Sequence, residues 1–152
     1  MTDAPKTRNE GATKAGDGAG GFIFDLADMK AIETGIGYAT TLGPVVEGER
    51  TQCGLMLKHK GTGARPHSHP NEQWNYVVKG RLRVEIDGEE PVIVGPGTLI
   101  YFPPDKVHAT IALPEEDVYF FVVKDLSHGI IGRAADGTMA GAHYEPGFEP
   151  KG

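Results

Sequence analysis

The sequence contains very little that could cross-link the chain or anchor it in a membrane. Its 152 residues include a single cysteine, Cys53, so no disulfide can form within the chain and a reducing cytoplasm is the simplest location. No stretch approaches the roughly 18 apolar residues that a membrane helix needs, and the N-terminal sequence lacks the apolar segment of a secretory signal. We therefore expect a cytoplasmic protein with no membrane partner.

Positive charge is also scarce. Lysine and arginine together number 15 against 21 acidic residues, which gives a formal net charge of −6. No basic stripe and no helix-turn-helix pattern occur. Because nucleic acids are bound through basic surfaces, we expect no nucleic acid partner.

Signals for long helices are few, whereas turn residues are abundant. The 22 glycines and 11 prolines stand between short apolar segments, and turn signals recur about every eight to twelve residues, as in β-barrels. The pattern predicts an all-β fold with a single barrel and a short helical turn within residues 25–33. The expected strands are residues 38–42, 51–58, 73–78, 82–86, 92–94, 98–102, 108–113 and 118–124.

The two ends of the sequence differ from its middle. Residues 1–20 are rich in small and charged residues and have no large apolar residue after Met1, so we expect a flexible N-terminal tail. Residues 21–125 hold the predicted barrel. Residues 126–152 are rich in glycine with scattered aromatics, and we expect them to form an irregular C-terminal extension that wraps the barrel.

Three histidines form the pattern with the clearest chemistry. His67 and His69 alternate in an extended segment, so both imidazoles lie on the same side of the chain. His108 follows several strands later, just after a Pro-Pro turn. Imidazole is a ligand for Fe(II), Mn(II), Ni(II) and Zn(II), and a barrel brings distant strands together. These residues therefore predict a site for one divalent metal ion.

The spacing around the first two histidines resembles a motif of the cupin family. Gly61, His67, His69, Gln73 and Gly80 match the first cupin motif, G-x5-H-x-H-x3-E-x6-G, at every position except one. The exception is Gln73, which stands where glutamate is usual.

The segment around the third histidine resembles the second cupin motif. Gly97, Pro103 and His108 match G-x5-P-x-G-x2-H, with Asp105 in place of its second glycine and Ala112 in place of the asparagine that ends the motif. The resemblance implies a small single-domain cupin, with a jelly-roll barrel and one bound divalent metal ion. It favours Fe(II), with Mn, Ni or Zn as alternatives.

The fourth metal ligand implied by the resemblance is Gln73. Glu72 lies beside it and is a carboxylate, but strand neighbours face opposite sides, and only Gln73 has the spacing to Gly80 that cupins keep. If Gln73 does not bind the ion, the site is a plain three-histidine face. Neutral imidazoles and a neutral amide leave the ion its double positive charge, so we expect a small anionic or enolisable substrate that chelates through oxygen.

Several activities remain open at this point. The resemblance favours an Fe(II) dioxygenase that cleaves carbon–carbon bonds, with a metal-dependent lyase, isomerase or cyclase second and a non-catalytic ligand-binding or structural cupin third. Tyr101, Arg83 and Glu85 are weak candidates for acid–base or substrate-positioning groups. Barrels of this kind often pair through an N-terminal strand, so we expect a homodimer that uses Phe22 to Phe24.

Overall fold

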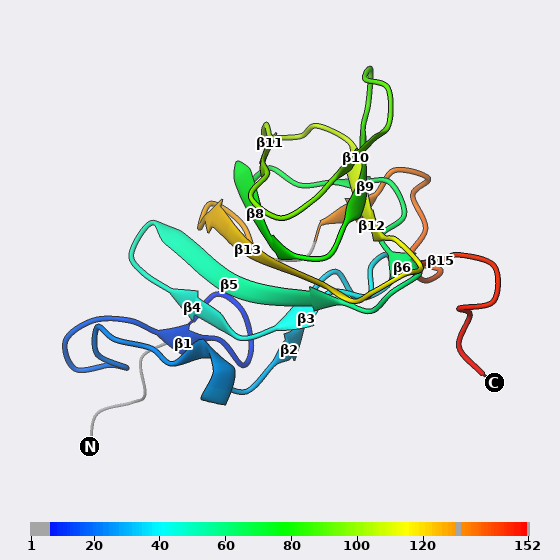
Figure 1. The fold of residues 1–152 in the computed structure, drawn as a ribbon. Helices are drawn as coiled ribbons and strands as arrows, with labels where there is room; N and C mark the ends of the chain where they lie inside the picture. Colours follow the sequence, from blue (N-terminus) through cyan, green and yellow to red (C-terminus); the bar gives the residue numbers. More distant parts are fainter. Residues whose placement is uncertain (1–6, 130–131, 152) are drawn as a thin grey trace.

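A computed structural model describes residues 7–129 and 132–151, and these residues form two packed β-sheets (Figure 1). The larger sheet contains β1 (Thr13–Lys14), β2 (Ile32–Glu33), β3 (Leu42–Gly43), β4 (Val45–Glu47), β5 (Thr51–Lys58), β8 (Gln73–Lys79), β11 (Leu99–Phe102) and β13 (Val118–Asp125). The smaller sheet contains β6 (Thr62–Gly63), β7 (His67–Ser68), β9 (Leu82–Ile86), β10 (Val92–Val94), β12 (His108–Ala112), β14 (Arg133–Ala134) and β15 (His143–Tyr144). The predicted all-β jelly-roll class is confirmed.

The strands with the clearest alternation occur where the sequence predicts them. β5, β9 and β10 have the predicted bounds, and β8, β11, β12 and β13 differ from theirs by one residue at an end. The predicted strand at 38–42 is wrong for most of its length. Gly35 and Gly37 adopt positive φ angles of 69° and 96°, and the N–H of Tyr38 bonds to the carbonyl of Gly35 at 3.0 Å, so this segment turns and the strand begins only at Leu42.

The predicted helical turn is present but short. It is a 3₁₀ turn, η1, of residues Leu26–Asp28, capped by the Asp25 side chain, which accepts a bond from the N–H of Ala27. Ile32 and Glu33 lie in β2 and pair with β3. No helix in the described part of the chain is long and apolar enough to cross a membrane.

The two longest strands direct alternate residues between the sheets. On β13, Val118, Phe120, Val122 and Lys124 are buried, while the residues between them are more exposed. On β5, Gln52, Gly54, Met56 and Lys58 are buried in the same way. Because burial follows the two-residue period of a strand, both strands present one face to the barrel interior.

The segments beyond the barrel also make contacts. β1 pairs with β4, and Asn9, within the predicted tail, is buried and donates to the side chains of Glu47 and Gln52 at 2.8 and 2.7 Å. β14 and β15 pair with β7 and β6. The N-terminal and C-terminal segments lie on opposite sides of the molecule (Figure 1). Residues 1–6 lie outside the described residues, and the predicted boundaries at 20 and 125 stay predictions.

Candidate metal centre

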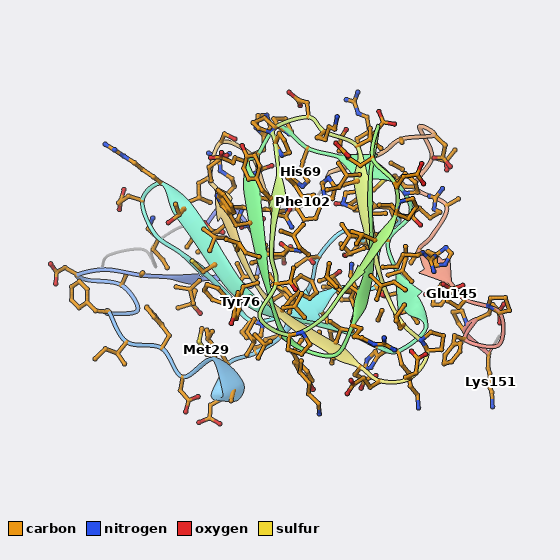
Figure 2. The ribbon with its side chains drawn as sticks, turned by 45° about the horizontal axis from the view of Figure 1, so that its top comes forward. Met29, His69, Tyr76, Phe102, Glu145 and Lys151 are labelled. Atoms are coloured by element: carbon orange, nitrogen blue, oxygen red, sulfur yellow. The ribbon has the colours of Figure 1, made fainter. Side chains whose placement is uncertain are left out.

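The three histidines meet inside one end of the barrel. His67 lies on β7 and pairs directly with His108, the first residue of β12, and His69 follows β7. The potential ligand nitrogens of the three side chains lie within 4.8 Å of one another. All three rings are buried, and the ring of His108 stacks on Phe102 with centroids 4.2 Å apart. Figure 2 shows His69 and Phe102 at this end of the molecule.

The backbone fixes the orientation of each imidazole. The Nδ1 atoms of His67, His69 and His108 lie 2.8, 3.0 and 2.8 Å from the carbonyl oxygens of Arg65, Asn71 and Lys106. A carbonyl oxygen only accepts hydrogen bonds, so each Nδ1 carries the proton and each Nε2 keeps a lone pair. Metal-binding histidines in proteins are commonly oriented by such a bond.

The surroundings also keep the imidazoles uncharged. Burial lowers the pKa of His67 to about 2, that of His69 to about 4 and that of His108 to about 3. The charges of neighbouring groups lower these pKa values further, with His108 acting on His67 and Lys124 on His69. Three neutral imidazoles with free lone pairs are the protonation state that a metal ion requires.

The turn before β12 contains the residue that replaces a glycine of the second motif. Asp105 has a φ of 61°, which is the left-handed region that glycine adopts most easily and that aspartate tolerates better than most residues. Its N–H bonds to the carbonyl of His69 at 2.8 Å. The turn therefore ties the segment of His69 to the start of β12, where His108 begins the strand.

The structure places the side chain of Gln73 inside the barrel and that of Glu72 on the surface. Gln73 is buried and lines the cavity beside the histidines. Its Nε2 donates to Oδ1 of Asn75 at 2.7 Å, which leaves its carbonyl oxygen as the atom available to an ion. Glu72 is exposed and accepts a bond from the hydroxyl of Tyr101 at 2.7 Å. Ligation by Gln73 stays a prediction.

A small cavity of about 50 Å³ opens beside the histidines, which is room for only a few water molecules. It is lined by Thr34, Gly35, Tyr38, Ala39, Thr41, Met56, Lys58, Ala64, His67, Gln73, Asn75, Phe102, His108, Thr110, Phe120, Val122 and Lys124. Tyr38 covers one side, with its ring 4.3 Å from that of His67 and its hydroxyl accepting the N–H of Gly132 at 2.7 Å.

Two lysines in the cavity were missed by the sequence analysis. Lys58 is 3% and Lys124 is 7% exposed, and burial lowers their pKa values to about 7 and about 8. They stand at the ends of β5 and β13, where a lysine ordinarily extends into solvent. The available signal was parity, because each lysine follows three inward positions at intervals of two residues.

The three weak catalytic candidates lie elsewhere. Tyr101 is on the outer face of β11, where it packs against Trp74 with ring centroids 4.5 Å apart. Arg83 forms ion pairs with Glu85 and with Glu145, at 3.1 and 2.6 Å. None of the three candidates is among the residues described as lining the cavity. Glu85 instead shares a second pocket with His108, outside this cavity.

The residues present fit a divalent ion. Nε2 of His69 is buried and has no hydrogen-bond partner among the described residues, although a buried polar atom is normally paired. An ion held by the three Nε2 atoms would satisfy this nitrogen. The identity of the ion does not follow from the ligand set, since imidazole accepts several first-row metals.

Comparison with known proteins agrees with this architecture. Residues 54–124 match the family model described as "Cupin domain". Over 90 residues the chain is 37% identical to polyketide synthase CurC of Streptomyces cyaneus, an alignment that covers 55% of this chain and 57% of that protein. The chain thus spans little more than half the length of this curated relative.

Solved structures extend the likeness over more of the chain. The polyketide cyclase RemF from Streptomyces resistomycificus superposes with a TM-score of 0.58 and 24% identity, covering 68% of this chain and 78% of that one. KdgF from Halomonas sp. gives a TM-score of 0.58 and 23% identity, and the match covers 67% of this chain and 92% of that one. At these identities the likeness establishes the fold.

Proposed function

We propose that this chain, whose residues 54–124 match the cupin-domain family model, is a metal-dependent enzyme that acts without oxygen on a small enolisable compound. The reaction class is that of a lyase, isomerase or cyclase. The observation that carries the proposal is a set of three buried histidines whose potential ligand nitrogens lie within 4.8 Å of one another. They lie beside a cavity that is lined by His67, His108 and two lysines and, among the described residues, by no carboxylate.

His67, His69 and His108 would hold the ion, with the carbonyl oxygen of Gln73 as a fourth ligand. A divalent ion bound there would act as a Lewis acid that stabilises an enolate chelated through two oxygens. The apolar side chains of Phe102, Phe120 and Val122 line the same cavity. They exclude water, which strengthens the electrostatic interactions of a bound anion.

The curated relative supports a particular substrate class. Polyketide chains carry carbonyl groups in 1,3 relation, and a 1,3-dicarbonyl compound forms an enolate that chelates a metal through both oxygens. The alignment to that polyketide synthase is 37% identical and covers 55% of this chain. We therefore propose the 1,3-dicarbonyl unit as the recognised group, and leave the remainder of the substrate open.

The Fe(II) dioxygenase favoured by the sequence is the second candidate. It needs the same three-histidine face with open coordination positions, so the ligand set alone does not separate the two. We place it second because a polyketide cyclase is among the solved structures that share this fold. Oxygen consumption distinguishes the two activities.

The test combines metal analysis with two activity measurements. Protein purified anaerobically should contain about one equivalent of metal, and the variants His67→Ala and His108→Ala should contain none, while the surface variant His59→Ala keeps it. The metal-loaded protein should exchange deuterium into the carbon between the carbonyls of acetylacetone without oxygen. Oxygen uptake in proportion to substrate loss would support the dioxygenase instead, and metal content unaffected by the histidine variants would refute both.

A homodimer is proposed separately. The outer face of the larger sheet carries apolar side chains, and Trp74, Tyr76 and Leu99 are 40%, 46% and 59% exposed. Phe22 and Ile23 are 74% and 94% exposed, as expected of a segment that packs on a second subunit. Such apolar surface commonly marks an interface. A monomer at micromolar concentration in light scattering would refute this proposal.

A further inference from the structure

Lys58 is a buried cation that the metal site does not need. It leaves β5 opposite Val118, on the apolar side of the barrel interior, and reaches the histidine cavity with its Nζ 5.5 Å from the centroid of the Phe120 ring. Lys58, His67 and His108 line the same cavity.

The partners of Lys58 are neutral. Nζ donates to Oγ1 and to the carbonyl oxygen of Thr110, at 2.8 and 3.1 Å. An ammonium group has three hydrogens, so the third can bond a ligand in the cavity. The hydroxyl of Thr110 accepts from Lys58 and keeps its own hydrogen, which makes it a second donor.

The charge around Lys58 is unbalanced. Within the described residues, the cavity lining includes Lys58, Lys124 and two histidines but neither aspartate nor glutamate, although the chain as a whole has a net charge of −6. A buried charge without a counter-charge is strongly destabilising. Since Lys58 faces no acidic side chain of the described lining, a ligand is the natural source of the negative charge.

We infer that Lys58 and Thr110 form a subsite for a carboxylate, and that the substrate is a small acid whose carboxylate binds there while its other oxygens face the histidines. The second half of this inference rests on the proposed function. The subsite itself does not, because it uses no metal ligand. The size of the cavity limits the bound part of the acid to a few heavy atoms.

The experiment measures acetate binding by NMR titration of the full-length chain, both loaded with Zn²⁺ and after removal of metal with a chelator. Acetate should bind the metal-free protein, and the neutral isostere acetamide should not. Lys58→Met should weaken acetate binding by about 10- to 100-fold, because it removes a charge-assisted hydrogen bond. Thr110→Val, which keeps the lysine, should weaken it by about fivefold.

The matched control is Lys79→Met, which removes the same charge from an exposed position on β8 and should leave acetate affinity unchanged. Equal acetate binding by wild type, Lys58→Met and Thr110→Val would overturn the inference, as would the absence of acetate binding to the metal-free wild type. Zinc content is measured in parallel. If the wild type takes up one equivalent of zinc but does not bind acetate, only the subsite is refuted. If it binds acetate but takes up no zinc when zinc is supplied, only the proposed metal enzyme is refuted.

Discussion

The interior of the barrel is polar at one end and apolar at the other. Inward-facing residues change in this way along two strands, from Gln73 and Asn75 to Val77 on β8, and from His108 and Thr110 to Ala112 on β12. Leu82 and Val118, both 0% exposed, complete the apolar end. Apolar burial stabilises the fold, whereas buried polar groups do so only when they are fully paired. The comparison indicates that the apolar end provides stability and that the polar end is kept for binding.

The largest expected effect is loss of metal binding at the polar end. His67→Ala should lower zinc affinity by more than about 100-fold, because even residues that only orient a ligand contribute about 10- to 100-fold. A ligand that binds only the folded state stabilises it by about 4 kcal/mol at 1,000 times its dissociation constant. Zinc at this ratio should therefore raise the unfolding free energy of the wild type by about 4 kcal/mol and that of His67→Ala by less than about 1.4 kcal/mol, as measured by urea denaturation.

A substitution at the apolar end should lower stability and leave metal binding unchanged. Leu82→Ala removes a fully buried side chain from the core and should lower the unfolding free energy of the metal-free protein by about 3 kcal/mol. Zinc stoichiometry should remain that of the wild type under native conditions. If Leu82→Ala lost zinc as completely as His67→Ala, the two ends would not be separable and the comparison would fail.

Lys58 crosses from one end to the other, and its effect on stability should depend on pH. Burial lowers its pKa from 10.5 to about 7 in the folded protein, so the unfolded chain binds more protons between these pH values. Stability of the wild type therefore rises with pH across this window, by up to about 1.4 kcal/mol per unit. Lys58→Met abolishes this contribution. It should stabilise the protein most below pH 7, with a gain that shrinks toward pH 10.

Urea denaturation of both proteins at pH 6 and pH 9, in buffers without carboxylate or phosphate, measures this difference. Lys124, His67 and His108 face the same cavity and are kept in the variant, so subtraction of the two curves gives the contribution of Lys58 together with its electrostatic coupling to these three groups. A gain independent of pH would show that the charge of Lys58 is not destabilising in the folded state.

The contrast between histidines and lysines also explains what the sequence could predict. His67, His69 and His108 were found because their spacing matches two motifs, and the alternation of β9 and β5 fixed the strand bounds. Lys58 and Lys124 were missed because strand-end lysines usually reach solvent. Parity along β5 and β13 directs both lysines inward, but whether an inward lysine at a strand end is also covered depends on tertiary packing, which parity does not show.

The turn at residues 35–38 was missed for a related reason. Tyr38 is aromatic and Thr40 and Thr41 are β-branched, which favours a strand, but the glycines before Tyr38 adopt left-handed angles that direct its ring onto His67. Parity, in contrast, placed Gln73 inward and Glu72 outward correctly, because the two-residue period of a strand is a local property.

The smallest expected effect concerns the turn that supports the polar end. Asp105 has a φ of 61°, where a side chain costs free energy that glycine avoids. Asp105→Gly should change the unfolding free energy by less than about 1 kcal/mol, since relief of strain is offset by the greater freedom of glycine in the unfolded chain. Asp105→Ala should be less stable than Asp105→Gly by about 1 kcal/mol, because alanine has a Cβ but no polar group that favours the left-handed conformation.

Denaturation of the two Asp105 variants, together with their zinc affinities, tests whether the turn acts through backbone conformation. Because the N–H of residue 105 bonds to the carbonyl of His69 and both variants keep that N–H, zinc affinity should follow stability, with glycine above alanine. If alanine matched glycine in both measurements, the left-handed turn would not be what aligns His69 with His108. The alignment of His69 with His108 would then have to come from the Nδ1 hydrogen bonds of the histidines alone.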